Sequence, residues 1–155
     1  MGQTASYLAD ILARDARGTP LLLVEVKAIP IRDQATLRQL VGYLTAAARG
    51  FPYVMLVDHL LIRVFRMRDG RADPLLELRT PEIVRAYEPE MPMREINHGY
   101  LVGLVEAWLH DLSYNWNSAA PPGLKQIEKA GLARVLKGCT TALEAEIDVA
   151  YDPLP

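Results

Sequence analysis

The feature that most constrains the fold is a short apolar run, Leu21 to Val24, followed at once by alternating residues. A uniformly apolar strand is typical of a strand that other elements cover on both faces. From Val24 the chain reads Val-Glu-Val-Lys, so charge appears at only one end of this strand. The pattern predicts an interior strand of a sheet, buried along most of its length, that presents Glu25 and Lys27 where it ends.

A second strand precedes this one. Residues 7–13 are apolar apart from Asp10, and a polar, glycine-containing turn separates them from residues 20–28. Two strands joined by such a turn predict a β-hairpin.

The register of this hairpin follows from its turn. In an antiparallel pair, the sequence numbers of facing residues have a constant sum that the turn centre fixes. Asp10 and Glu25 sum to 35, which places the centre between Arg17 and Gly18, inside the turn. We therefore expect these two carboxylates to face each other with Cβ atoms about 5 Å apart. Lys27 should project from the same face, because it lies two residues beyond Glu25.

The next elements complete a sheet core. Asp33 is a plausible N-cap for a helix through Ala48 with an apolar stripe along one side. Residues 53–57 and 60–67 read as two further strands, closed by the turn at residues 68–71. The first half is thus ββαββ in chain order, which predicts an α/β (α+β) fold with a mixed central sheet.

The second half has a helical period. Thr80 and Pro81 resemble the cap and first residue of a short helix, residues 93–116 show the strongest helical pattern, and residues 121–136 predict another helix. We therefore divide the chain into a core, residues 1–79, and a helical extension, residues 80–155, packed on the same domain.

Composition bounds the function. The 155 residues carry a net charge of −2, with a sequence pI near 5.9, which argues mildly against a DNA binder that relies on overall charge. A local cluster of basic residues could still bind DNA phosphates, and the sequence offers Arg63, Arg66, Arg68 and Arg71. A solvated strand edge and turn explains the same arginines equally well. No membrane-spanning run or secretion signal is recognisable, and the single Cys139 forms no disulfide within the chain, so we expect a cytoplasmic protein without a membrane partner.

The facing carboxylates suggest a chemistry. Two acids about 5 Å apart repel unless a cation lies between them. Mg²⁺ (or Mn²⁺) prefers carboxylate oxygens, and the backbone carbonyl of Val26 could complete the ligand set of Asp10 and Glu25. The ion would activate a water molecule, with Lys27 orienting it, which outlines phosphodiester hydrolysis. The structural alternative is an exposed cross-strand charge ladder of little energetic value.

These residues resemble the PD-(D/E)XK nuclease superfamily, whose motif pairs an acid on one strand with Glu-x-Lys on the next. Here the motif reads Ala9-Asp10 and Glu25-Val26-Lys27, and the resemblance covers about the first 70 residues. It implies a restriction-endonuclease-like core and Mg²⁺-dependent cleavage of DNA. By position it also implies a site role for Gln39, with Tyr43 one turn later, although both could equally be the solvated border of the helix.

The chain departs from that superfamily in one important respect. The superfamily core normally opens with a helix that forms one wall of the site, and only about six residues precede the first strand here. The C-terminal helices, a second copy in a homodimer, or a partner subunit could supply that wall. The alternative function is a catalytically inactive scaffold that acts as a nucleic-acid-binding or protein-interaction module through Thr80 to Leu136.

The remaining candidates have simpler explanations. Asp33, Asp58 and Glu77 are nearby acids for which capping or turn formation suffices. Trp108 and Trp116 are expected in the core or at a partner contact. The histidines lack the mutual spacing of a zinc site, so we assign them no role. They are His59, His98 and His110.

Overall fold

The computed structural model describes the backbone of residues 3–151 and the side chains of residues 7–147. A six-stranded mixed sheet organises the chain, in the order β5-β4-β3-β2-β1-β6. Only β2 and β3 run parallel, and every other neighbouring pair is antiparallel. The strands are β1 (Gln3–Arg14), β2 (Pro20–Val26), β3 (Tyr53–Val57), β4 (Leu61–Arg68), β5 (Arg71–Arg79) and β6 (Thr140–Tyr151).

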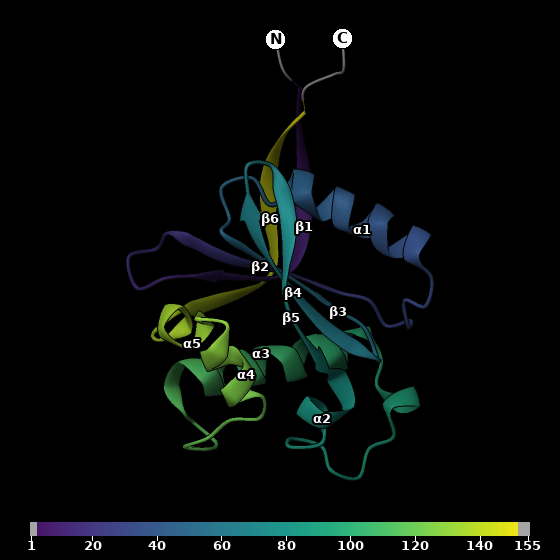
Figure 1. Ribbon diagram of the computed structural model, residues 1–155, viewed down its shortest axis with the longest axis vertical. Coiled ribbons are helices and arrows are strands. Elements are labelled where there is room, and N and C mark those ends of the chain that lie inside the picture. Colours follow the sequence, from purple (N-terminus) through teal and green to yellow (C-terminus); the bar gives the residue numbers. More distant parts are fainter. Residues whose placement is uncertain (1–2, 152–155) are drawn as a thin grey trace.

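Helices cover both faces of this sheet, and the core is correspondingly double (Figure 1). One apolar cluster lies between the sheet and α1, and the other lies between the sheet and α2 to α5. Leu23 belongs to the first cluster and its neighbours Leu22 and Val24 to the second, so β2 is buried on both faces as predicted. The helices are α1 (Gln34–Ala47), α2 (Thr80–Val84), α3 (His98–Tyr114), α4 (Leu124–Lys129) and α5 (Leu132–Leu136), with a 3₁₀ turn, η1 (Met93–Glu95).

The first hairpin has the predicted register. Ile11 faces Val24 and Leu12 faces Leu23, so facing residues sum to 35 until the ladder shifts at Arg14. The ladder ends at the pair of Ile11 and Val24, however, so it does not include the predicted pair of Asp10 and Glu25, which are the next residues of the two strands. The predicted chain order of two strands, a helix and two strands is also observed.

Two strands were not predicted. In β5, Pro74 interrupts the alternation opposite Phe65, where the register shifts, so the strand signal is broken. In β6, half of the 12 residues are alanine, glutamate or aspartate, which have weak β-propensity. Because β6 pairs with β1 along most of its length, the region after Thr80 is not helical throughout: its last described segment belongs to the sheet.

The helix boundaries follow local chemistry. Asp33 caps α1 as predicted, with Oδ1 accepting from the Thr36 N–H at 2.7 Å. The predicted cap at Thr80 is wrong: Arg79 is the N-cap, and the Thr80 hydroxyl instead donates to the carbonyl of Asp58. The helix predicted over residues 121–136 is two helices, because Gly131 adopts a left-handed conformation with φ +79°.

The two tryptophans of the extension differ. Trp108 is completely buried in the core of the α3 face, and its indole N–H donates to the Pro122 carbonyl at 2.8 Å. Trp116 is more than half exposed and stacks on Tyr87. The core prediction is confirmed for Trp108.

Candidate functional site

Asp10 joins the two strands of the hairpin through its side chain. Its Oδ2 accepts a hydrogen bond from the Val26 N–H at 2.7 Å. In a regular antiparallel ladder that N–H would bond to a backbone carbonyl of β1. The N–H and C=O of one residue point to the same side of a strand, so the Val26 carbonyl also faces β1. Asp10 and the Val26 carbonyl, both predicted ligands, therefore lie on the same side of β2.

Glu25 and Lys27 form an ion pair at the end of β2. The Lys27 Nζ lies 3.5 Å from Glu25 Oε1, and the lysine side chain is 41% exposed while the glutamate is 13% exposed. Burial raises the pKa of Glu25 above its ordinary value, and the charges of Lys27 and His98 offset only part of that rise. The carboxylate therefore lies in surroundings that would favour an additional cation.

His98 is the site residue that sequence reasoning missed. It is the first residue of α3, and its Nε2 lies 3.0 Å from Asp10 Oδ1. Asp10 and His98 are far apart in the sequence, and a helical period does not reveal which strand a helix end meets. The one local feature that could have shown that α3 begins at His98 is Asn97, which caps the helix by accepting a hydrogen bond from the Tyr100 N–H.

We call Asp10, Glu25, Val26 and Lys27 the hairpin site. Of the three nearby acids, Asp33 and Asp58 have the expected capping and turn roles, whereas Glu77 lies within the strand β5 and has neither. Asp33 is the cap of α1. Glu77 is exposed on β5, and both β3 and β4 lie between β5 and β2, so it is remote from the hairpin site.

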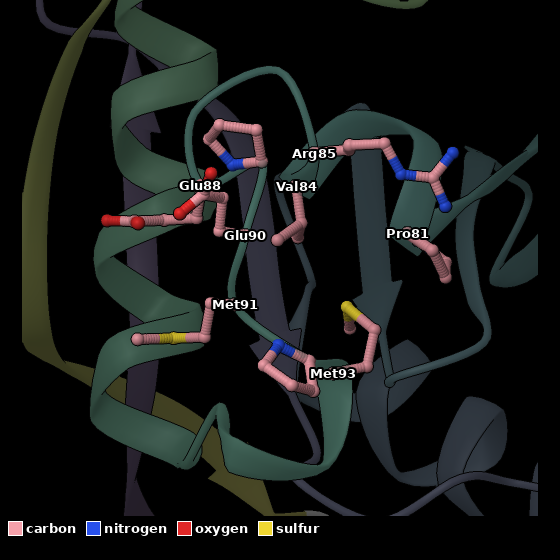
Figure 2. A pocket seen from close by; sticks show the side chains of 9 residues that line it. Pro81, Val84, Arg85, Glu88, Glu90, Met91 and Met93 are labelled. Carbon is pink, nitrogen blue, oxygen red and sulfur yellow. The ribbon is translucent and has the colours of Figure 1, made fainter.

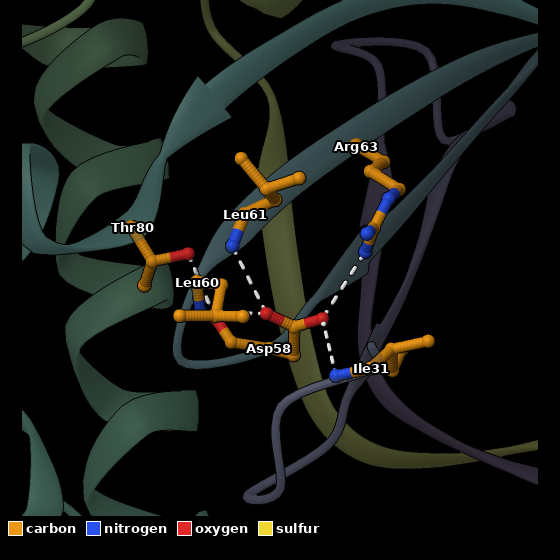
Figure 3. A network of polar contacts seen from close by, with 6 residues as sticks. All are labelled: Ile31, Asp58, Leu60, Leu61, Arg63 and Thr80. Atoms are coloured by element: carbon orange, nitrogen blue, oxygen red, sulfur yellow. Dashed lines mark hydrogen bonds and ion pairs between the residues drawn. The ribbon is translucent and has the colours of Figure 1, made fainter. Parts of the chain in front are cut away.

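Asp58 lies immediately after β3, at the same end of the sheet, in a network shown in Figure 3. Its Oδ1 accepts from the Leu60 and Leu61 N–H groups at 2.6 and 2.9 Å. Its Oδ2 accepts from the Ile31 N–H and from Arg63 Nη1, each at 3.1 Å. The carboxylate thus holds the β3–β4 turn against the loop that follows β2, which confirms the turn interpretation. We call these residues, with Thr80, the Asp58 cluster.

Gln39 makes no hydrogen bond or ion pair to the hairpin site among the described residues. Its side chain is exposed on α1. Tyr43 is 61% exposed and its ring packs 5.5 Å from that of Tyr7. A site role for Gln39 stays a prediction from the family resemblance.

The arginines do not gather beside the hairpin site. Arg63 is buried against Asp58. Arg66 faces Tyr53, which is aligned with Leu22, so Arg66 lies at the level of the fourth residue before Val26, about 13 Å along the strand direction. Arg68 and Arg71 lie further in that direction. The exposed part of this basic cluster is therefore at the opposite end of the sheet.

A separate cavity of about 270 Å³ lies between α2 and the segment that leads into η1 (Figure 2). Val84, Met91 and Met93 line it together with Arg85 and Glu88. None of the hairpin-site residues lines this cavity. It therefore adds nothing to the chemistry of the carboxylates.

The donor types at the hairpin site, two carboxylates and a carbonyl, are those that Mg²⁺ or Mn²⁺ prefers. Across residues 3–151, however, no three His, Cys, Asp or Glu side chains are grouped closely enough to hold a metal ion together. Glu25 is turned toward Lys27, so joint coordination requires this side chain to rotate. The donor types therefore suit a divalent ion, but the described side chains as they lie do not form a metal site.

Comparison with protein-family models, curated proteins and solved structures finds no match for this chain. None of the described helices combines the length and the hydrophobicity needed to cross a bilayer.

Proposed function

We propose that this protein is a metal-dependent nuclease that hydrolyses DNA phosphodiester bonds at the hairpin site. The observation that carries the proposal is the position of Asp10: its carboxylate reaches the β2 backbone at Val26, between Glu25 and Lys27. Asp10 of β1 and Glu25 and Lys27 of β2 thus lie at the same end of one hairpin. In this proposal Asp10, Glu25 and the Val26 carbonyl hold Mg²⁺ or Mn²⁺.

Each side chain has a defined role in the proposed reaction. When bound, the ion supplies an activated water molecule and neutralises charge on the attacked phosphate. Lys27 is accessible enough to leave Glu25, and its ammonium group then orients the water or contacts the phosphate. Glu25 carries a raised pKa because it is buried, and binding of a cation would favour its charged form.

The resemblance to the PD-(D/E)XK superfamily supports the same proposal. The chain order β1, β2, α1, β3 and β4 is the order that we expect from this resemblance, which supports the proposal. The wall expected from a first helix has a candidate in α3, whose first residue, His98, contacts Asp10.

The test is a cleavage assay with plasmid and linear DNA in the presence of Mg²⁺ or Mn²⁺. Lys27→Ala should reduce the rate by about 100-fold or more, because it removes the group that assists the water or the phosphate. Lys125→Ala, on α4, is the matched control and should cut like the natural protein. Equal rates for the natural protein and Lys27→Ala would refute the assignment.

The second candidate is a non-cutting module with this fold, which binds nucleic acid or a partner protein. Specific observations favour it: both oxygens of Asp10 are already engaged, Glu25 is paired with Lys27, and the net charge is −2. Calorimetry separates the two candidates. An Asp10-dependent heat of Mg²⁺ or Mn²⁺ binding supports the nuclease, and its absence supports the module. Mass measurement in solution tests whether a homodimer forms.

A further inference from the structure

We propose that one end of the molecule is a surface that binds the phosphate backbone of duplex DNA. We call it the turn–α5 surface, and its bases are Arg14, Arg17, Lys129, Arg134 and Lys137. The inference rests on the proposed function for the choice of DNA and deepens it, because it assigns the contact that holds the substrate. It also gives the region after Thr80 a part in binding.

The sheet brings the two segments of this surface together. Arg14 ends β1, where it faces Thr140, the first residue of β6, and α5 ends at Leu136, shortly before that residue. Leu136 also lines one small apolar pocket with Leu21, which follows the β1–β2 turn that carries Arg17. Figure 1 shows this turn, α4 and α5 on the same side of the molecule. Bases that are far apart in the sequence therefore gather at one end of the structure.

These segments concentrate positive charge. Residues 14–17 carry a net charge of +1 and residues 128–137 carry +2, and because the whole chain carries −2, the remaining residues carry −5. All five bases are exposed, and among residues 7–147 none of them takes part in an ion pair. Of the two acids, Asp15 is engaged by the N–H groups of Arg17 and Thr19 in its own turn. A protein of negative net charge thus presents a local positive field, and a phosphate responds to the local field.

The side chains beside these bases indicate the kind of partner. Neither residues 14–17 nor residues 128–137 include an exposed aromatic or large apolar side chain. Helical surfaces that bind a bilayer combine bases with apolar side chains that enter the lipid. Surfaces that bind single strands stack the nucleotide bases on aromatic rings. Exposed guanidinium and ammonium groups without such neighbours suit the phosphates of a duplex, which arginine and lysine contact most often.

The distance between this surface and the hairpin site fits a short stretch of duplex. Asp10 and Arg14 lie on one strand, about 13 Å apart along it. On the helical side, the N–H of Gly138, just after α5, donates to the carbonyl of Ser113, and His98 begins the same helix about 22 Å away. At about 3.4 Å per base pair, the two places are separated by about four to seven base pairs. A duplex with one phosphate at the hairpin site therefore reaches the turn–α5 surface.

The experiment is an anisotropy titration of a labelled duplex with the full chain in EDTA over a range of NaCl concentrations. A duplex of about 20 base pairs is long enough to cover both places. The test variant retains Arg14, which donates to the Gly18 carbonyl within the turn, and replaces four bases with glutamine. These are Arg17, Lys129, Arg134 and Lys137. Its affinity should be at least about tenfold lower, and the slope of log K against log[NaCl] should be shallower by about 3, because each lost phosphate contact removes about 0.9.

The matched control removes the same charge elsewhere on the surface of the molecule. It replaces four other exposed bases with glutamine, namely Arg38, Arg49, Arg85 and Arg94. We expect it to lose less than about threefold in affinity and to retain the salt dependence of the natural protein. Equal losses in the two variants overturn the inference, because overall charge would then account for binding.

Two further measurements keep the inference open to refutation. Vesicles that contain phosphatidylserine should bind the natural protein more weakly than the duplex does, and equal binding that the test variant also loses would make the partner a membrane and overturn the assignment. NMR spectra of the natural protein cover a folding defect in the variant. Added duplex should shift the amide resonances of residues 128–137 more than those of α1, and the reverse order refutes the surface.

Binding in EDTA requires no cleavage, so it separates this inference from the proposed function. In the cleavage assay the test variant should show a KM at least about tenfold higher with kcat changed less than about threefold, because it loses binding and not chemistry. If the natural protein binds the duplex through these bases but never cuts it, the proposed function fails and the binding surface stands. If the natural protein cuts DNA and the test variant binds and cuts equally well, only this inference fails.

Discussion

Asp58 and the pair of Asp10 and Glu25 lie at the same end of the sheet but differ in burial and in the partners of their carboxylates. Asp58 is completely buried, and its two oxygens accept four hydrogen bonds, one of them from the Arg63 guanidinium. Asp10 and Glu25 are partly accessible, and each is paired with a side chain that is itself 41–52% exposed.

This difference indicates that Asp58 stabilises the fold, whereas Asp10 and Glu25 can exchange their partners. Backbone N–H groups and a buried guanidinium cannot leave Asp58 without unfolding the turn. Lys27 and His98 can turn toward solvent at little cost, because exposed ion pairs contribute little free energy. Asp58 therefore serves the fold, whereas the partners of Asp10 and Glu25 can be exchanged, as the proposed function requires.

The largest expected effect is at Asp58. Asp58→Ala removes the acceptor of four hydrogen bonds and leaves Arg63 buried without its partner, so the free energy of unfolding should fall by about 3–5 kcal/mol. Denaturant unfolding measures this. Asp69→Asn, in the exposed turn after β4, is the control and should stay within about 0.5 kcal/mol of the natural protein. If the free energy of unfolding of Asp58→Ala falls by less than about 1 kcal/mol, Asp58 does not have the structural role that separates it from Asp10 and Glu25.

A smaller effect is expected at Asp10. Asp10→Asn retains an oxygen that can accept from the Val26 N–H and removes only the charge, so the free energy of unfolding should fall by about 1 kcal/mol or less. The same denaturant series provides the measurement. If Asp10→Asn lowers the free energy of unfolding as much as Asp58→Ala does, Asp10 has a structural role like that of Asp58, which argues against its proposed role as a metal ligand.

The smallest change in the free energy of unfolding is expected at Glu25, where the direction of the pH dependence is the informative result. Because burial raises the pKa of Glu25, the folded state retains the proton more strongly than the unfolded state, and this contribution to stability is lost as the pH rises through the raised pKa. Glu25→Gln should therefore be the more stable protein near neutral pH, with an advantage that shrinks as the pH falls below the ordinary glutamate value. Urea melts between pH 4 and pH 7.5 measure it; an advantage that grows toward acid would contradict the sign.

Local rules account for the parts of the site that the sequence predicted. The register of Ile11 with Val24 and of Leu12 with Leu23 follows from one turn, so its prediction needs no knowledge of the rest of the chain. The cap at Asp33 likewise depends on a residue three positions away.

The parts that were missed depend on distant contacts. His98 reaches Asp10 from the other half of the chain, and Arg63 reaches Asp58 across a turn whose burial only the complete fold creates. The role of Gln39 rests on the family resemblance alone and stays a prediction; the structure shows only that its side chain is exposed on α1.

The pairing of β6 with β1 has a consequence for the order in which the molecule assembles. Ile11 lies beside Leu143, so the strand that bears Asp10 gains its second neighbour only after the distant segment around Leu143 has been synthesised. Contacts between such distant positions close slowly, because a long loop must be ordered before they form. The hairpin can form early from local contacts, yet until β6 arrives one side of β1 is an open edge, and that is when nascent chains are most exposed to mispairing.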